Sequence, residues 1–377
     1  MGKRWIWFLT AVVAAATAVA AFWKPAGSRL TDLSVYLGAV SGLADGAGLY
    51  DFTRGAAPFT YPPFAALLFT PLTWLPVGVV QIAWTLASLA TVAGLAVLVT
   101  RRNQPVVALA LMLSAPVSSD VKYGQVSLFL AALVAADFLA LRRTPWHGAL
   151  VGLAAAVKLT PLIFIPLLWL AGRRTAAAVA TATFAACGLL AAATLPGDSW
   201  AFWTDKVFQV NRLGYIDGVG NQSLNGALLR LGIEADARRT LVLFVGGTVA
   251  AVALARAVRL ARRQDWLSAV IVVGAASIVL SPVSWTHHQI WLVLAVLLPI
   301  GKVQKAVVLA VMILPVPVLF AESRLLLAVA VAALIPLHDD AGPGHRTRIP
   351  LHDDADRGTG MRTPLTETGG RSAVTVA

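Results

Sequence analysis

Asp32 is the first carboxylate of the sequence. It lies about nine residues beyond Trp23, where an apolar run that starts at Trp5 comes to its end. An ionised carboxylate at the centre of a bilayer costs several kcal/mol, so Asp32 is expected at a water boundary. A carboxylate there can act as a general base that deprotonates an attacking hydroxyl group. The simpler interpretation is that Asp32 caps a helix starting at Leu33, a role that does not exclude catalysis.

Lys158 and the pair His287 and His288 are the basic side chains that could complement this acid. Lys158 lies in the sequence VKLTP, and the two histidines end the sequence SPVSWTHH. A lysine, Arg212 and a histidine can hold a phosphate leaving group and stabilise the charge that develops on it. The structural alternatives are a lysine that extends its amine to the membrane surface and a histidine bonded to backbone at the end of a span.

Composition places these residues in a polytopic membrane protein. Of the 377 residues, 58% are hydrophobic and 13% are charged, whereas soluble domains carry about 25% charged residues. The net charge of +12 comes from short basic pairs between apolar runs, which is a topology signal and argues against nucleic acid as a partner. The single cysteine, Cys187, lies in an apolar run, so we predict no intrachain disulfide, no thiolate metal site and no cofactor.

The basic clusters predict the topology. Cytoplasmic loops are enriched in Lys and Arg, and a span needs about 20 residues, so we expect about twelve transmembrane helices with both termini in the cytoplasm. The same placement makes residues 30–63 and 196–239 the long first and fourth extracytoplasmic loops of a plasma membrane protein. The clusters are Lys3 and Arg4, Arg101 and Arg102, Arg142 and Arg143, Arg173 and Arg174, the arginines from Arg256 to Arg263, and Lys302 with Lys305.

The interval between Arg143 and Arg173 is too short for two full spans. We therefore expect Gly148 to Leu170 to form a shallow helical hairpin with Lys158 on irregular backbone at its tip. Irregular backbone at membrane depth is tolerated where it lines a cavity.

The C-terminal segment has a different composition. Residues 338–377 are polar, and the sequence IPLHDDA occurs at 335–341 and again at 349–355. The His-Asp-Asp triplets could be drawn as metal ligands, but a segment of this composition is typical of disorder. We predict a membrane domain over residues 1–337 and a disordered cytoplasmic tail over 338–377.

The candidate residues of the membrane portion all fall on the extracytoplasmic side of this topology. A carrier would place polar groups at mid-depth in paired halves, so one-sided chemistry favours an enzyme. Outside the cell there is no nucleotide pool, and an activated sugar is expected on a lipid phosphate. Glycosyl transfer from such a lipid is one interpretation; a transporter or flippase of a lipid-linked sugar is the other.

Seven short motifs occur in order between residues 30 and 290: TDLSVY (31–36), GLYDF (48–52), PFTYPPF (58–64), GQ (124–125), KLTP (158–161), NQS (221–223) and SPVSWTHH (281–288). In this combination the chain resembles glycosyltransferase family 87 of the GT-C superfamily. The resemblance implies an all-α polytopic fold of GT-C type and an inverting, metal-independent mannosyl transfer. The donor would be polyprenyl-phosphate-mannose, the acceptor a glycolipid and the new linkage α-(1→2). An arabinofuranosyltransferase using decaprenyl-phosphoryl-arabinose is the alternative within the family.

This resemblance places the essential acid of the family on Asp32, to which we assign the base role. The histidine motif falls on His287 and His288, one of which would contact the donor phosphate or the acceptor, and Lys158 would face the phosphate charge. The Tyr-Pro-Pro sequence is also a structural bend, and the Asn-Gln-Ser sequence could serve only as a turn. The further candidates for substrate binding are Tyr61, Gln125, Asn221 and Gln222.

Overall fold

The computed structural model describes residues 2–55 and 57–337. Within them the chain is almost entirely helical, with one short antiparallel hairpin of β1 (Thr53–Arg54) and β2 (Ala57–Pro58). The helices are α1 (Lys3–Phe22), α2 (Thr31–Ala44), α3 (Pro63–Phe69), α4 (Val77–Val99), α5 (Gln104–Leu113), α6 (Ala115–Tyr123), α7 (Ser127–Leu139), α8 (Ala149–Val157), α9 (Phe164–Leu170), α10 (Arg174–Thr194), α11 (Pro196–Thr204), α12 (Leu224–Arg230), α13 (Ala235–Leu241), α14 (Gly247–Arg262), α15 (Trp266–Leu280), α16 (Ile290–Leu294), α17 (Lys302–Ile313), α18 (Val316–Leu319) and α19 (Ser323–Val329).

The structure supports an all-α membrane protein. Four helical segments of the described residues are long and apolar enough to cross a membrane, namely Lys3–Phe22, Val77–Val99, Arg174–Thr194 and Ala235–Arg262. The pair α5 and α6 makes a fifth if its 65° bend lies within one span. The predicted count of about twelve crossings is not confirmed, because other apolar helices, such as Ser127–Leu139 and Trp266–Leu280, have only 10–17 residues. The predicted tail, residues 338–377, lies outside the described residues.

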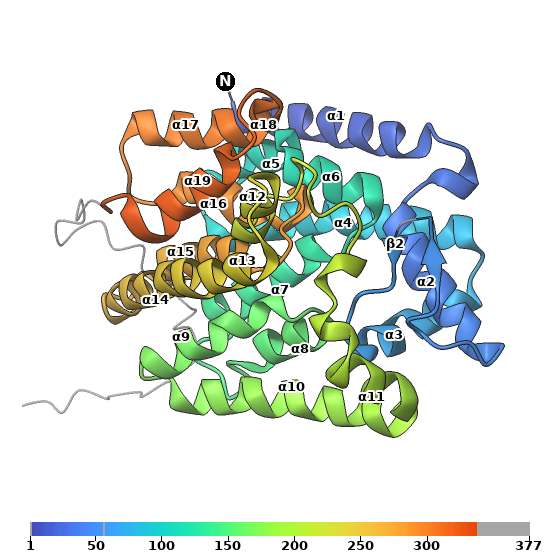
Figure 1. Cartoon of the computed structure of the whole chain (residues 1–377). Helices are drawn as coiled ribbons and strands as arrows, with labels where there is room; N and C mark the ends of the chain where they lie inside the picture. The colour runs from blue at the N-terminus through green and yellow to red at the C-terminus, as the bar shows by residue number, and fades with distance from the viewer. Residues whose placement is uncertain (1, 56, 338–377) are drawn as a thin grey trace, which may run out of the picture. The chain divides into compact units, whose positions relative to one another are not determined.

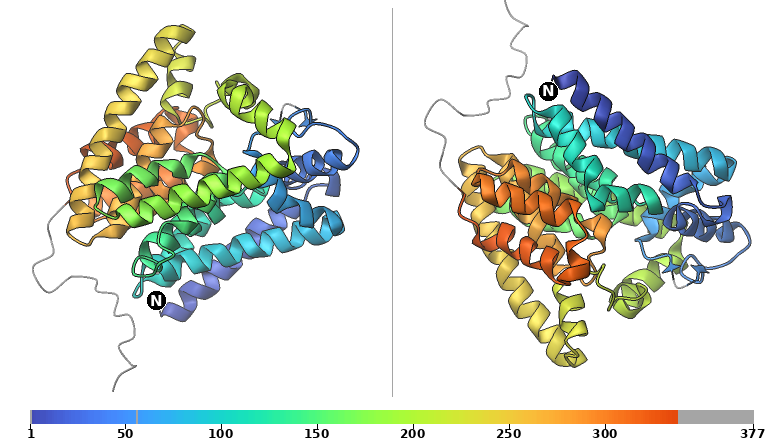
Figure 2. Two further views of the ribbon diagram at one scale, coloured as in Figure 1. Left: turned by 90° about the horizontal axis from the view of Figure 1, so that it is seen from below. Right: turned by 90° about the horizontal axis from the view of Figure 1, so that it is seen from above.

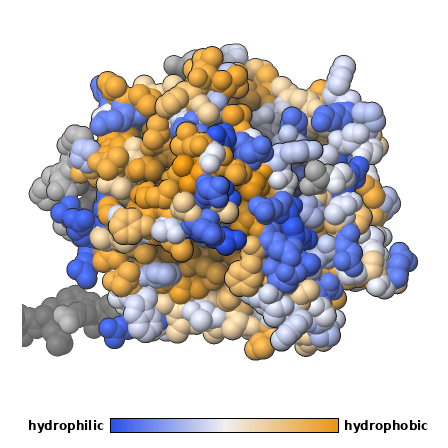
Figure 3. Space-filling model, viewed as in Figure 1, coloured by the Kyte–Doolittle hydropathy of each residue, from blue (hydrophilic) through white to orange (hydrophobic). Residues whose placement is uncertain are grey.

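The long helices flank a core of short ones. Figures 1 and 2 show α10 along one side of the molecule, with α1 and α17 along the opposite side, and α7, α8 and α15 between them. Helix α15 is buried along most of its length. Large apolar side chains such as Leu86, Leu243 and Phe244 are exposed by 61%, 74% and 76%, as expected for surfaces that face lipid. In Figure 3 apolar residues dominate the face over α14 and α15, and polar residues gather on the side of α2.

The predicted hairpin between Gly148 and Leu170 is present. A carbon atom added at Gly148 would lie 2.0 Å from the Ala176 carbonyl oxygen, and one added at Gly152 would lie 2.3 Å from that of Ala180. The contact partner moves forward from Ala176 to Ala180 as the glycine moves forward from Gly148 to Gly152, so α8 and α10 run in the same direction. The segment between them, the 3₁₀-helix η3 (Thr160–Ile163) and α9, therefore returns the chain and leaves Lys158 at the turn.

A buried carboxylate on α7 secures the start of this hairpin. Asp137 accepts hydrogen bonds from the backbone N–H groups of Gly148 (2.6 Å) and Val151 (2.9 Å) at the N-terminus of α8. These N–H groups have no partner within the helix, so the carboxylate satisfies donors that would otherwise be buried without a bond. The Asp137 carboxylate thus fixes the start of α8, the helix whose other end leads directly into Lys158.

The close contact between α8 and α10 gives a test of the fold. Gly152→Val should destabilise the protein by about 1–3 kcal/mol, because its side chain would overlap backbone of α10. Gly188→Ala is the matched control in α10, where nothing lies within 4 Å of the added carbon; it should be neutral or slightly stabilising. Thermal unfolding of the two purified variants in detergent measures the difference, and equal midpoints would contradict the packing.

Candidate active site

Asp32 lies in the first turn of α2, against the turn that follows α6. Gly124 has a φ of +69°, and a carbon atom added there would lie 2.8–2.9 Å from the side chains of Leu33 and Leu30. Glycine is the residue that permits both this backbone conformation and this close approach. The Gly-Gln sequence therefore brings Gln125 alongside the start of α2.

Gln125 links Asp32 to two tyrosines. Its amide nitrogen donates to Oδ2 of Asp32. Its amide oxygen lies 2.9 Å from the hydroxyl groups of both Tyr36 and Tyr61, which are 2.8 Å from each other. Gln125, Tyr36 and Tyr61 are all buried. Predicted site residues from three separate segments thus form one network.

The environment of Asp32 favours a base of raised proton affinity. Burial raises the pKa of the Asp32 carboxyl above its ordinary value, because the ionised form loses hydration. The hydrogen bond from Gln125 and the charge of Lys158 lower the pKa and offset part of this effect. The carboxyl is half-buried, and its Oδ1 has only a long contact of 3.4 Å with the Thr31 hydroxyl.

Lys158 lies between Asp32 and the histidine motif. Helix α8 ends at Val157, and Lys158 itself is extended, with φ −152° and ψ 134°. Its Nζ is 2.7 Å from Nε2 of His288 and 5.2 Å from the centroid of the Tyr61 ring. The Tyr61 hydroxyl contacts Gln125, so Tyr61 has the Asp32 network at its hydroxyl and the Lys158 amine over its ring face.

The two histidines have different surroundings. His288 accepts a hydrogen bond at Nδ1 from the Trp285 N–H (3.2 Å), and burial, followed by the nearby Lys158 charge, holds its pKa well below the ordinary value. His287 is 5% exposed, with its ring 6.4 Å from that of Tyr123 and 4.5 Å from that of His288. Neither ring nitrogen of His287 has a hydrogen-bond partner among the described residues. His288 therefore belongs to the Lys158 cluster directly, and His287 borders it.

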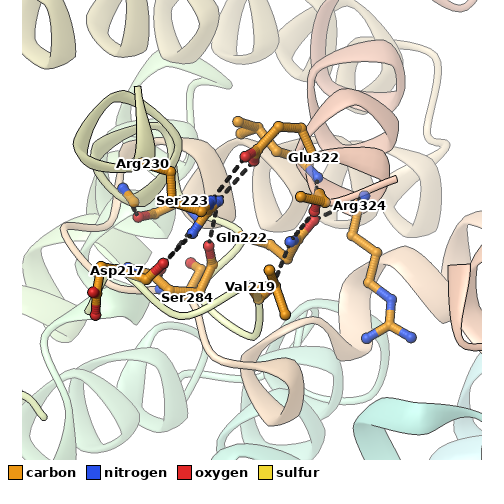
Figure 4. Close-up of polar contacts among 12 residues, drawn as sticks. Asp217, Val219, Gln222, Ser223, Arg230, Ser284, Glu322 and Arg324 are labelled. Carbon is orange, nitrogen blue, oxygen red and sulfur yellow. Dashed lines mark hydrogen bonds and ion pairs between the residues drawn. The ribbon is translucent and has the colours of Figure 1, made fainter. Parts of the chain in front are cut away.

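Asn221 and Gln222 lie away from this cluster and hold loops together. Gln222 donates to the carbonyl groups of Val219 and Ala321 and accepts from the backbone N–H groups of Arg324 (3.0 Å) and Leu325 (3.2 Å), as Figure 4 shows in part. All four hydrogen-bonding positions of this amide are used. Its predicted contact with substrate would have to displace one of these bonds.

Asn221 connects the same loop to the segment before the histidines. Its Oδ1 accepts from the N–H of Ser284 (2.8 Å) and of Ser223 (3.2 Å), and its Nδ2 donates to the Ile216 carbonyl (2.8 Å). Nearby, Arg230 forms a two-pronged ion pair with Glu322 at 2.7 and 2.9 Å, which Figure 4 also shows. In this arrangement Asn221 supports the backbone that leads to His288.

Two residues near the site have no assigned role in the sequence analysis. Tyr36 looked like one aromatic in an apolar helix, although its spacing of four from Asp32 places both on one face of α2. Asp120 is fully buried, caps α7 by accepting from the Leu128 N–H (3.1 Å) and lies within electrostatic reach of Lys158. Asp120 lies seven residues before Ser127, within α6, so the local sequence gives no signal for this cap.

A slot opens beside Lys158 and His288. Besides Lys158 and His288 it is lined by seven apolar residues and by the hydroxyl side chains of Ser127, Thr160, Ser277 and Ser284. Such a slot suits a ligand with a charged group at one end and an apolar body. The apolar lining residues are Leu130, Ala131, Val134, Pro161, Phe164, Ile278 and Trp291.

Comparison with known proteins identifies the family. The model of Glycosyltransferase family 87 matches residues 59–282, which is more than half of the chain. This chain belongs to glycosyltransferase family 87. The matched region contains Tyr61, Gln125 and Lys158, while Asp32 lies 27 residues before its start and His288 lies six residues after its end. The protein is therefore a glycosyltransferase.

Curated relatives extend the similarity over most of the chain. The chain is 33% identical over 330 residues to a Mycobacterium tuberculosis protein described as a polyprenol-phosphate-mannose-dependent alpha-(1-2)-phosphatidylinositol mannoside mannosyltransferase, covering 79% of this chain and 77% of the relative. It is 35% identical over 290 residues to a Mycolicibacterium smegmatis phosphatidylinositol pentamannoside mannosyltransferase of the same donor dependence, covering 71% and 69%. No solved structure matches significantly.

The fully hydrogen-bonded amide of Gln222 predicts that this side chain stabilises the fold. Gln222→Ala should lower the free energy of unfolding by about 1–3 kcal/mol, because two buried backbone N–H groups lose their acceptor. Gln209→Ala, at a half-exposed glutamine of the same loop that bonds to the exposed side chain of Asp205, should change it by less than about 0.5 kcal/mol. Thermal unfolding in detergent tests this; an unchanged midpoint with a raised substrate KM would favour direct substrate binding instead.

Proposed function

We propose that this family 87 enzyme transfers mannose from polyprenol-phosphate-mannose to a phosphatidylinositol-mannoside glycolipid, forming an α-(1→2) bond with inversion. The described donors and acceptors of the relatives in Mycobacterium tuberculosis and Mycolicibacterium smegmatis support the substrates. The observation that carries the mechanism is the convergence of Asp32 and Lys158 on opposite parts of Tyr61. In this proposal Asp32 supplies the base on one side of the reacting sugar, and Lys158 supplies the cation on the other side.

The chemical step is a single displacement at the anomeric carbon. The acceptor hydroxyl oxygen attacks that carbon, its proton passes to Asp32, and the bond from the carbon to the phosphate oxygen breaks. One displacement inverts the configuration, so a β-linked mannosyl phosphate gives an α-mannoside. Lys158 stabilises the negative charge on the departing polyprenyl phosphate, and His288 lines the slot beside it.

The slot beside Lys158 suits the donor lipid. A polyprenyl phosphate carries its charge at one end of an apolar chain, and the slot has Lys158 and His288 beside an apolar lining. The first isoprene units would pack in the slot while the phosphate meets the lysine.

The membrane arrangement follows from the basic clusters. We place the enzyme in the plasma membrane as a multi-pass protein of GT-C type, with both termini in the cytoplasm and Asp32 at the extracytoplasmic face. Residues 1–337 form the transferase domain in this proposal. The excess of Lys and Arg in the short connections between apolar runs supports this orientation.

Asp32→Asn tests the base. The amide cannot accept the proton, so transfer of radiolabelled mannose from polyprenol-phosphate-mannose to the glycolipid acceptor should fall by about 10²–10⁴-fold. Equal amounts of wild-type and variant protein in membranes provide the control. Activity with decaprenyl-phosphoryl-arabinose in place of the mannose donor would overturn the sugar assignment, and lipid movement without a new glycosidic bond would indicate a flippase.

The pH dependence tests the pairing of Lys158 with Asp32. The base acts when ionised, so activity should rise with pH through the pKa of Asp32, which burial raises above the ordinary value. Lys158→Met removes a charge that lowers this pKa and should shift the acid limb of kcat/KM to higher pH, whereas Lys158→Arg should leave the limb close to its wild-type position. If the acid limb of kcat/KM does not move in Lys158→Met, the charge of Lys158 does not act on Asp32 and the proposed pairing is wrong.

A further inference from the structure

The amide of Gln125 has a preferred orientation. A glutamine presents an acceptor oxygen and two N–H donors of nearly equal size, and only its partners decide which end faces a neighbour. The hydroxyl groups of Tyr36 and Tyr61 both lie 2.9 Å from the same end. An ionised Asp32 carboxylate only accepts, so the amide N–H groups face it, and the two hydroxyl groups donate to the amide oxygen at the other end.

Counting protons shows that this orientation is held redundantly. The two tyrosine oxygens and the Gln125 oxygen are each within 2.9 Å of the other two, but the three contacts share two hydroxyl protons. Either both tyrosines donate to the glutamine, or one donates to the other, which then donates to the glutamine. In both arrangements the amide oxygen receives a donor.

The rings that carry these hydroxyl groups are held by packing. The Tyr36 ring stacks on Phe69 at a centroid distance of 4.7 Å and an angle of 11°, and lies edge-on to Tyr61 at 5.1 Å. The Tyr50 hydroxyl donates to the Tyr61 carbonyl (2.8 Å). The hydroxyl positions are therefore determined by buried aromatic contacts rather than by flexible side chains.

We infer that Tyr36 and Tyr61 are positioning residues that act through Gln125 to orient the carboxylate of Asp32 for proton transfer. The inference rests on the proposed role of Asp32 as the base. With Oδ2 of Asp32 bonded to Gln125, Oδ1 is the oxygen that meets the acceptor hydroxyl. This gives Tyr36 a function, and it changes the expectation for Tyr61 and Gln125 from substrate binding to support of the base.

Tyrosine-to-phenylalanine variants test the inference. Phenylalanine keeps the ring that stacks on Phe69 and the ring face under Lys158, so only the hydroxyl is lost. Tyr36→Phe and Tyr61→Phe should each lower kcat only a few-fold, because the remaining tyrosine still donates to Gln125. The double variant should lower kcat by roughly 100-fold, as expected for a misplaced reacting group, with the donor KM unchanged.

The pH profile separates orientation from general damage. In the double variant the amide oxygen loses both hydroxyl donors that hold it, so the Gln125 side chain is less fixed and its hydrogen bond to Asp32, which lowers the Asp32 pKa, weakens. The acid limb of kcat should therefore move to higher pH. Gln125→Met should show the same shift and the same loss, and combining it with the double variant should add nothing, because the three residues act along one path.

Thr85→Val is the control, since it loses a buried hydroxyl hydrogen bond of similar length, to the Gln81 carbonyl, outside this network. It should leave both kcat and the acid limb in place. Additive losses in the two single variants, an unmoved acid limb in the double variant, or a raised donor KM with normal kcat in Tyr61→Phe would each overturn the inference. If Asp32→Asn itself retains transfer, the proposed base fails instead, which is a distinguishable result.

Discussion

The hydrogen bond between Gln125 and Asp32 is the interaction on which the site depends. A carboxylate in a largely apolar protein is stable only where bonds or water compensate its burial, and here the compensation comes from one amide donor and a nearby lysine. That amide is placed by the left-handed turn at Gly124 and by two buried tyrosines. The start of α2, the segment before α3 and the segment after α6 therefore meet at one carboxylate.

Lys158 reaches this point by a different route. Helices α8 and α10 pack so closely at Gly148 and Gly152 that no larger residue fits without displacement of backbone. The turn of the resulting hairpin lies at Lys158. The Lys158 amine contacts His288 on one side and the Tyr61 ring on the other. The cation and the acid are thus positioned by independent parts of the fold, which explains why motifs so distant in the sequence are needed together.

Candidate site residues could be selected from the sequence, but their arrangement could not. Asp32, Lys158 and the histidine motif could be chosen because acids, amines and imidazoles are rare in an apolar chain, and the hairpin followed from the spacing of basic pairs. The role of Tyr36 could not be predicted, since an aromatic residue in an apolar helix usually packs in the core. Gln222 was expected to contact substrate, but a single polar side chain gives no sign of the four backbone partners that occupy it.

The number of membrane spans was the feature hardest to predict from the sequence, because helix breaks such as the bend between α5 and α6 depend on packing with distant helices.

A structure of the enzyme with a non-reactive polyprenol-phosphate-mannose analogue would test the central claim most directly. The account predicts the phosphate against Lys158, the prenyl chain in the adjoining slot and the anomeric carbon facing Oδ1 of Asp32. A phosphate bound away from Lys158, or a sugar out of reach of Asp32, would contradict it.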